Sequence, residues 1–243
     1  MKRILLVLAC AAALPACGDS NGGTTGPTPS GEPLVANIEH RVDMQPLAFD
    51  STEYVNAAGN KYTVSRLEYY LSGVVFQPEG GSSHSVKGAF YVNAADPQTM
   101  KIDLGAVPAG NYESVQLFIG LDDETNVTGG LPNTKENVDM AWPEHMGGGY
   151  HFLKCEGHYQ DPNAATVGYA MHMGGNETRI TVTIAKAFTL AKDSPSLTLA
   201  MNLDEWYQNP HEYNFDVDGN YTMHDDVAKQ KLKENGADVF TME

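Results

Sequence analysis

Soft metal-binding side chains are concentrated in residues 140–175 of this chain. The stretch holds four of the eight histidines, four of the ten methionines and one of the two tryptophans. Imidazole nitrogen and thioether sulfur suit copper, and Cu(I) especially, better than they suit hard cations, which prefer oxygen ligands. For any single residue the alternative is structural, because methionine commonly fills gaps in a core. The cluster as a whole predicts a copper site.

His172 lies between two thioethers, in the sequence Met171-His172-Met173, and two glycines follow. Successive side chains of a strand point to opposite faces, so the three residues cannot bind one ion unless the chain bends. The glycines could supply such a bend. We expect instead that one face carries His172 as a ligand and that the other face is core.

Two further segments pair imidazole with thioether. Trp142 is followed by His145, Met146 and three glycines. A tryptophan flanked by proline and glycine is typical of a loop anchor packed on a sheet edge, and His145 and Met146 add a weaker indication of a metal site in this loop. Met223 and His224 open the predicted C-terminal helix and repeat the pairing.

His40 is the candidate ligand nearest the N-terminus. Strand periodicity places it on the same face as Ile38 and Val42, which should be buried. A buried imidazole needs a polar partner. That partner is either a carbonyl or hydroxyl group, as in a satisfied core histidine, or a metal ion, and periodicity leaves both open.

The strand-like residues 149–157 contain a histidine and a cysteine. In a strand, Cys155 points to the same face as His151 and Leu153. A cysteine so placed is usually a small core hydrophobe, so we expect Cys155 in the core.

Residues 1–16 predict a signal peptide. Lys2 and Arg3 precede an apolar run over residues 4–14 that is too short to span a bilayer as a helix. The run ends in Leu-Pro-Ala-Cys, which resembles the lipobox of bacterial lipoproteins, where the cysteine is acylated and becomes the mature N-terminus. We therefore expect an exported lipoprotein that carries its lipid on Cys17.

Residues 17–33 contain no large apolar side chain, so we expect a flexible tether between the lipid and a domain over residues 34–243. Gly18 directly after the cysteine favours, by resemblance, the outer membrane, at its periplasmic face or at the cell surface. Roughly 210 residues suffice for one β-rich domain with a full core. Acylation of Cys17 leaves only Cys155 as a thiol, so no intramolecular disulfide is expected.

The charge of the chain excludes one class of partner. The formal net charge is −16 at pH 7, and removal of residues 1–16 leaves 13 basic against 31 acidic residues, or −18. Such a surface repels nucleic acid and anionic lipid headgroups. We therefore expect no nucleic-acid binding, and contact with a membrane only through the lipid anchor.

Strand signals dominate the domain. Apolar and polar residues alternate over residues 34–42 and 180–184, and apolar runs cover residues 115–119 and 197–201. Clusters of glycine, proline, asparagine and aspartate between them are typical of turns. The pattern predicts an all-β fold, an antiparallel β-sandwich with long loops.

One short C-terminal helix accompanies the predicted sheets. Asp225 or Asp226 can cap its start, and Ala228 and Leu232 lie four residues apart on one face. An Asn-Gly pair at residues 235–236 can end it.

No catalytic motif stands out. The chain has no P-loop, GxGxxG, HExxH, GxSxG or CxxC sequence. Histidine and acidic residues are too plentiful for one Ser-His-Asp combination to be favoured over another. We expect the protein not to be an enzyme.

Several segments together resemble the MbnP-like family of periplasmic or surface copper-binding proteins, which is related to the methanotroph copper proteins MopE and CorA. The resemblance spans nearly the whole predicted domain, in the family's order. Its segments are residues 38–40, 54–72, 107–112, 118–122, 140–142, 149–157, 171–175, 204–206, 223–224 and 235–240.

The resemblance implies a β-sandwich that binds copper, as Cu(I) or Cu(II), through imidazoles and through a tryptophan oxidised to kynurenine by a di-haem partner of the MbnH type. The positions that match the family's metal-site residues are Trp142, His172, His40 and His224. The family's second tryptophan is replaced here by Glu144. The resemblance then implies His145 or Met146 as its substitute.

Two other functions compete with copper capture, storage or transfer. A non-catalytic surface sandwich would recognise a glycan or a protein through exposed aromatic residues among Tyr69, Tyr70, Trp206 and Tyr207. A hydrolase would need a deep cavity that gathers histidine and carboxylates around a nucleophile. Copper bound by histidine should be released near and below the reference imidazole pKa of about 6.5, a property that neither alternative shares.

Overall fold

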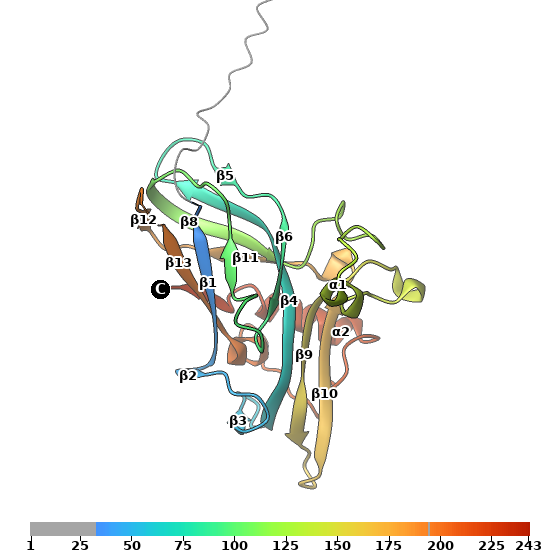
Figure 1. Cartoon of the computed structure of the whole chain (residues 1–243). Helices are drawn as coiled ribbons and strands as arrows, with labels where there is room; N and C mark the ends of the chain where they lie inside the picture. The colour runs from blue at the N-terminus through green and yellow to red at the C-terminus, as the bar shows by residue number, and fades with distance from the viewer. Residues whose placement is uncertain (1–32, 194) are drawn as a thin grey trace, which may run out of the picture.

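Two β-sheets enclose the core of the protein. The computed structural model describes residues 33–193 and 195–243, so the expected signal peptide, Cys17 and nearly all of the expected tether lie outside the described residues. Figure 1 shows the strands of the smaller sheet at the left of the view and the long strands β4, β9 and β10 of the larger sheet running down its centre. The predicted all-β sandwich is confirmed.

The smaller sheet is hydrogen-bonded in the order β14-β13-β1-β2, and β7 also pairs with β1. Its strands are β1 (Val35–Val42), β2 (Gln45–Pro46), β7 (Lys101–Asp103), β13 (Ser196–Asn202) and β14 (Phe240–Met242).

The larger sheet has the order β10-β9-β4-β8-β11. Three short strands, β3, β5 and β6, also pair with β4, and β12 pairs with β8. Its strands are β3 (Tyr54–Val55), β4 (Lys61–Pro78), β5 (His84–Ser85), β6 (Ala89–Asn93), β8 (Gly110–Ile119), β9 (His151–Gln160), β10 (Thr166–Gly174), β11 (Ile180–Ile184) and β12 (Phe188–Leu190).

β4 is the longest strand and joins the two halves of the larger sheet. Its early residues alternate between buried and exposed, but all side chains from Leu67 to Val74 are buried except Gly73. Register shifts interrupt its pairing with β8 and with β9. Gly73 lies at such a shift with a φ of +56°, and a Cβ there would lie 2.4 Å from the Phe118 ring. Glycine therefore permits the irregularity that bends the strand.

One pairing departs from the expected antiparallel arrangement. β1 and β13 run parallel, from the pair Val35–Ser196 to the pair Arg41–Asn202. Parallel neighbours require a long connection, and here most of the domain lies between the two strands. Alternation of apolar and polar residues is the same in both arrangements, so the sequence pattern did not distinguish them.

The loop between β8 and β9 covers residues 120–150 and contains α1 (Lys135–Asp139) and the 3₁₀ turn η1 (Glu144–Met146). Two further 3₁₀ turns are η2 (Asn176–Thr178) and η3 (Leu203–Tyr207). The predicted C-terminal helix is α2 (Asp226–Asn235). The Asp225 side chain accepts from the Ala228 N–H at 2.9 Å, and Ala228 and Leu232 are buried, as the sequence predicts.

Four aromatic residues that the sequence offered for surface recognition are core residues. Tyr69, Tyr70, Trp206 and Tyr207 are all at most 2% exposed. The expectation that they are exposed was wrong, because β4 is covered on both faces and η3 packs inward. Cys155 is buried as predicted, with its Sγ 3.7 Å from the Tyr207 hydroxyl. Within the described ranges no helix is long and apolar enough to cross a membrane.

Candidate metal centre

The loop before β9 folds back on itself and carries Trp142 to the start of that strand. The N–H of Trp142 donates to the Gly149 carbonyl at 2.9 Å, and the N–H of His151 donates to the Met140 carbonyl at 2.6 Å. The indole Nε1–H donates to the Met146 carbonyl at 3.1 Å, within the turn. These bonds hold the indole beside His151, the first residue of β9.

Trp142 is packed between His151 and the edge strand β10. Its ring centroid lies 4.7 Å from that of His151, with the planes at 74°. A Cβ on Gly174 would lie 2.3 Å from the indole Cε3, so only glycine leaves room for the ring. Trp142 is 3% exposed. It is a loop anchor on a sheet edge, as the sequence predicts, and also the neighbour of an imidazole.

His151 and His172 meet on the outer face of the larger sheet. Their ring centroids are 5.1 Å apart and their planes are perpendicular, at 89°. The β9–β10 ladder shifts register here, since Met173 pairs with Leu153 but Gly174 pairs with His151. The extra residue in β9 is Phe152. A one-residue slip moves a side chain to the other face of a strand, and this bulge turns His151 towards His172.

Hydrogen bonding fixes which nitrogen of His151 carries a proton. Its Nδ1 lies 3.1 Å from the Met140 carbonyl oxygen, which can only accept, so Nδ1–H donates. In the neutral ring Nε2 then holds the lone pair. Burial, and then the charge of Lys154, lower the pKa of His151 to about 3. This imidazole is therefore neutral, the form that binds metals.

The Glu156 carboxylate selects the other ring nitrogen, Nε2, as the hydrogen-bond donor in His172. Its Oε1 accepts from His172 Nε2 at 2.8 Å. The hydrogen bond from His172 and the charge of Arg66, 3.3 Å from the same oxygen, lower the pKa of Glu156, so this carboxylate is an acceptor only. In neutral His172 the lone pair is on Nδ1. That atom is buried and has no hydrogen-bond partner among the described residues.

The pair thus has the chemistry of a metal centre. Each imidazole donates one N–H to a fixed oxygen and, in its neutral form, has a lone pair on its other nitrogen, the arrangement that orients metal-binding histidines in proteins. A buried polar atom without a partner is uncommon and calls for an explanation such as a missing ion. The donors fit copper, because imidazole nitrogen is a ligand that copper accepts in both oxidation states.

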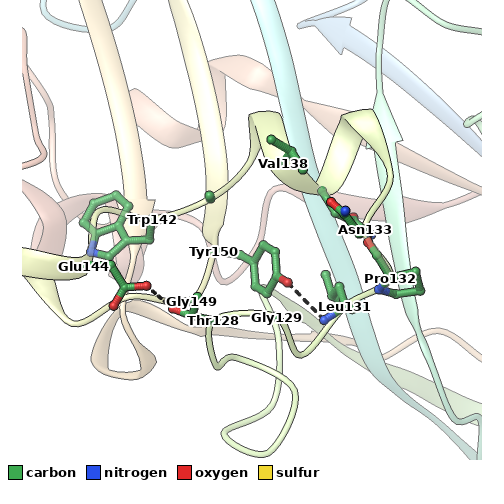
Figure 2. A pocket seen from close by; sticks show the side chains of 12 residues that line it. Thr128, Gly129, Leu131, Pro132, Asn133, Val138, Trp142, Glu144, Gly149 and Tyr150 are labelled. Atoms are coloured by element: carbon green, nitrogen blue, oxygen red, sulfur yellow. Dashed lines mark hydrogen bonds between the residues drawn. The ribbon is translucent and has the colours of Figure 1, made fainter.

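A cavity of about 380 Å³ lies on the far side of Trp142 from this pair. Figure 2 shows Trp142 at one end, Tyr150 in the centre, and the Thr128 hydroxyl donating to Glu144 at 2.6 Å. Trp142 lines the cavity, but neither histidine does. The indole therefore separates the cavity from the two imidazoles.

Comparison with known proteins assigns the chain to a family. A model of the MbnP family matches residues 31–225. The chain belongs to the MbnP family. A similar solved structure is MbnP from Methylosinus trichosporium, which is 14% identical and aligns with a TM-score of 0.50 over 73% of this chain and 78% of that chain. At this identity the likeness concerns the fold alone. No curated protein matches the chain.

In this MbnP-family chain, the structure brings together two of the residues singled out from the sequence, Trp142 and His172. His145 is exposed on η1. His224 is also exposed, although its segment runs beside β10, where the Thr222 hydroxyl donates to the His172 carbonyl at 2.7 Å. Among the described residues, no group of three or more His, Cys, Asp or Glu side chains is arranged to hold a metal ion.

His40 lies on the other side of the larger sheet. Its Nε2 is 2.8 Å from the Tyr69 hydroxyl, and burial lowers the pKa of His40 to about 4. Tyr69 pairs with Leu153, whereas the neighbouring Glu68 pairs with Lys154, which pairs with His172. Adjacent residues of a strand face opposite sides, so His40 and His172 cannot share one ion.

The thioethers of β10 do not join the histidine pair. Met171 and Met173 are at most 1% exposed in the core, on the face opposite His172, so the strand does not bend to gather all three. His151 and Glu156 are the site residues that sequence reasoning missed. The one signal for Glu156 is its spacing from Lys154 on the outer face of a predicted strand, and this signal is weak.

Proposed function

We propose that this protein binds copper between His151 and His172, against the indole of Trp142, and that it captures, stores or transfers the metal outside the cell. The observation that carries the proposal is the buried, unpartnered Nδ1 of His172, 5.1 Å ring to ring from His151, whose lowered pKa keeps its imidazole neutral. Copper is cargo in this proposal, and the protein is a carrier rather than an enzyme.

The protein supplies orientation and exclusion of water. Glu156 and the Met140 carbonyl set the tautomers before the metal arrives, so little reorganisation is needed on binding. The indole of Trp142, packed against Gly174, lies against His151 and also lines the cavity. Two imidazole nitrogen ligands suit Cu(I) or Cu(II) and disfavour hard cations.

The decisive experiment is the copper content of the purified chain after growth with copper. We expect wild type to hold one copper more than His172→Ala and one more than His151→Ala. His145→Ala is the matched control, because that histidine is exposed and touches neither ring. Equal copper in all four proteins would refute the proposed centre.

Oxidation of Trp142 is a second part of the proposal. A peroxidase-like di-haem partner of the MbnH type, with peroxide as the oxidant, would cleave the indole C2–C3 bond with addition of two oxygen atoms, and hydrolysis would release C2 as formate. The Nε1–H, which now donates to the Met146 carbonyl, would become the aromatic amine of kynurenine beside His151. The mass of the peptide that contains Trp142, with and without co-expression of such a partner, tests this. An unchanged mass with the partner present would limit the site to unmodified ligands.

We also propose that the chain is anchored to the outer membrane by a lipid on Cys17. The supporting observation is the apolar run followed by Leu-Pro-Ala-Cys. Cys17→Ala should move the protein from the membrane fraction to the soluble fraction, and fractionation of cells expressing each form tests it.

A further inference from the structure

A second cavity opens at one edge of β1, in the smaller sheet. Along its other edge β1 is paired with β13 over most of its length. Along the edge of β1 that faces the cavity, the two short strands β7 and β2 pair only with the two ends of β1. The space between the short strands is a cavity of about 450 Å³.

Three soft donors line this cavity, namely His40, Met44 and Met100. The N–H of Ile38 donates to the Met100 carbonyl at 2.8 Å, so Met100 continues the β7 ladder opposite Ile38. Opposite residues of an antiparallel pair share a face, and so do Ile38 and His40 along the strand. Met100 and His40 are therefore diagonal neighbours, at a spacing of roughly 7–8 Å that long side chains can bridge.

Met44 completes the set from the turn between β1 and β2. The N–H of Leu47 donates to the His40 carbonyl at 3.0 Å, which closes the turn onto the end of β1. Asp43, with a φ of +53°, makes the turn tight. Met44 is 88% exposed, so its thioether contributes little to core packing. Met44 therefore offers a thioether at the rim of the cavity that core packing does not require.

His40 lines the cavity, and the Tyr69 hydroxyl engages only one of its two ring nitrogens. That nitrogen is Nε2, which lies 2.8 Å from the hydroxyl oxygen. In the tautomer that donates from Nε2, the lone pair is on Nδ1, and the hydroxyl acts as the oxygen that orients a metal-binding imidazole. The charges around the cavity do not oppose a cation, because Glu39 lines it and Arg41, which also lines it, is ion-paired with Glu243.

We propose that His40, Met44 and Met100 form a second, separate site for a soft monovalent metal ion, Cu(I) or Ag(I). One imidazole and two neutral thioethers are a donor set that soft ions prefer and that hard cations do not. The site lies across the larger sheet from His172, so it does not depend on the centre proposed above.

Titration of the full chain with Ag(I), a soft ion that is not oxidised in air, tests the site directly. We expect the methyl resonances of Met44 and Met100 to shift together in the NMR spectrum. The double variant Met44→Leu with Met100→Leu should weaken binding at this site by roughly tenfold or more, since both thioether ligands are lost. His172→Ala should leave the two methyl shifts unchanged.

The variants are chosen to preserve the fold. Leucine replaces methionine with little change in volume, and Met223→Leu outside the cavity is the matched control. His40→Gln keeps a polar group towards Tyr69 and should also weaken binding. Unshifted methyl resonances at saturating Ag(I), or unchanged Ag(I) affinity in either the double variant or His40→Gln, would overturn the proposal.

Discussion

At the scale of single residues, Glu156 determines which nitrogen of His172 is offered to a metal. Its Oε1 accepts from Nε2 at 2.8 Å, which leaves Nδ1 as the lone-pair atom. Glu156→Gln keeps the shape but removes the charge and weakens the acceptor. We expect copper affinity to fall roughly 10- to 100-fold, the usual effect of losing a group that orients a metal ligand. Competition with a chromophoric copper chelator measures it.

Glu68→Gln is the matched control for this change. Glu68 also binds Arg66, at 2.8 Å, but it does not contact His172. Its loss perturbs the same charged network without touching the imidazole. Equal losses of affinity in both variants would show that the network acts only through charge, and that Glu156 has no orienting role.

His151 shows why part of the site could not be predicted from sequence. Alternation along β9 places it with Leu153 and Cys155, facing the core. The bulge at Phe152 turns the His151 side chain to the outer face instead, because Gly174 of β10 pairs with His151 and not with Phe152. A bulge is a property of two paired strands, so the pattern of one strand does not contain it. His172, in regular alternation with two core methionines, was predictable.

At the scale of elements, Gly174 at the end of β10 sets the position of Trp142. Gly174→Ala would place a Cβ 2.3 Å from the indole Cε3, and neither the strand nor the ring can move freely. We expect a loss of about 1–3 kcal/mol in the free energy of unfolding, as for other overpacked sites, with a red shift of tryptophan emission. Urea denaturation followed by fluorescence measures both.

Gly168→Ala provides the comparison within the same strand. Its added Cβ would lie 3.3 Å from the tip of the exposed Tyr221 side chain and 3.9 Å from the Gly157 carbonyl oxygen, which is an ordinary contact. This variant should retain wild-type emission and lose little stability. If the two alanine variants behave alike, the close packing of Trp142 on β10 is not what requires glycine at position 174.

Asp204, in η3, is a carboxylate whose burial destabilises the protein at neutral pH. Burial, then the charge of Asp43, raise the pKa of Asp204 to about 6 from its ordinary 3.8. A raised pKa means that stability is fully present below about pH 4 and is lost as the pH rises through 6. Asp204→Asn should therefore stabilise the protein at pH 7.5 by up to about 3 kcal/mol, and by almost nothing at pH 4.

The free energy of unfolding of both proteins, measured across this pH range, checks the sign. Asparagine can still accept from the Tyr62 hydroxyl, which lies 3.4 Å from Asp204 Oδ1, so the contact is preserved. A gain in stability that is the same at pH 4 and pH 7.5 would contradict the assignment to ionisation.

Some elements follow from the local sequence pattern, whereas others depend on which strands pair with each other. β11 shows clean alternation of buried and exposed residues, and α2 has its cap and its apolar face in the sequence. β4 has no such pattern in its second half, because both of its faces are covered. The parallel pairing of β1 with β13 is likewise a long-range choice, made by residues far apart in the chain.

At the scale of the whole molecule, the larger sheet separates two sets of soft ligands. Glu68 pairs with Lys154, which pairs with His172 on one face of the larger sheet. The next residue, Tyr69, points to the opposite face and contacts His40 there. Sites without shared partners normally behave additively. The sequence alone would group His172 and His40 in one copper site. In the structure they belong to two separate sets of ligands, and a substitution in one set should leave metal binding by the other unchanged.

The net charge of the protein should govern how fast copper arrives. The chain carries a formal charge of −16, and a field of one sign raises the association rate of opposite charges. An increase of ionic strength from about 0.01 to about 0.15 M shortens the Debye length from about 30 to about 8 Å. We expect Cu(II) association to slow several-fold, with little change in dissociation. Stopped-flow quenching of Trp142, in a Trp206→Phe background, measures both rates.

An anionic copper chelate provides the control for this prediction, because the same field repels it. Its association should become faster, not slower, as salt is added. Opposite responses of the cation and the anion would assign the effect to the charge of the protein. If salt slows both, its effect does not depend on the sign of the ligand's charge, and long-range attraction is not what delivers the metal.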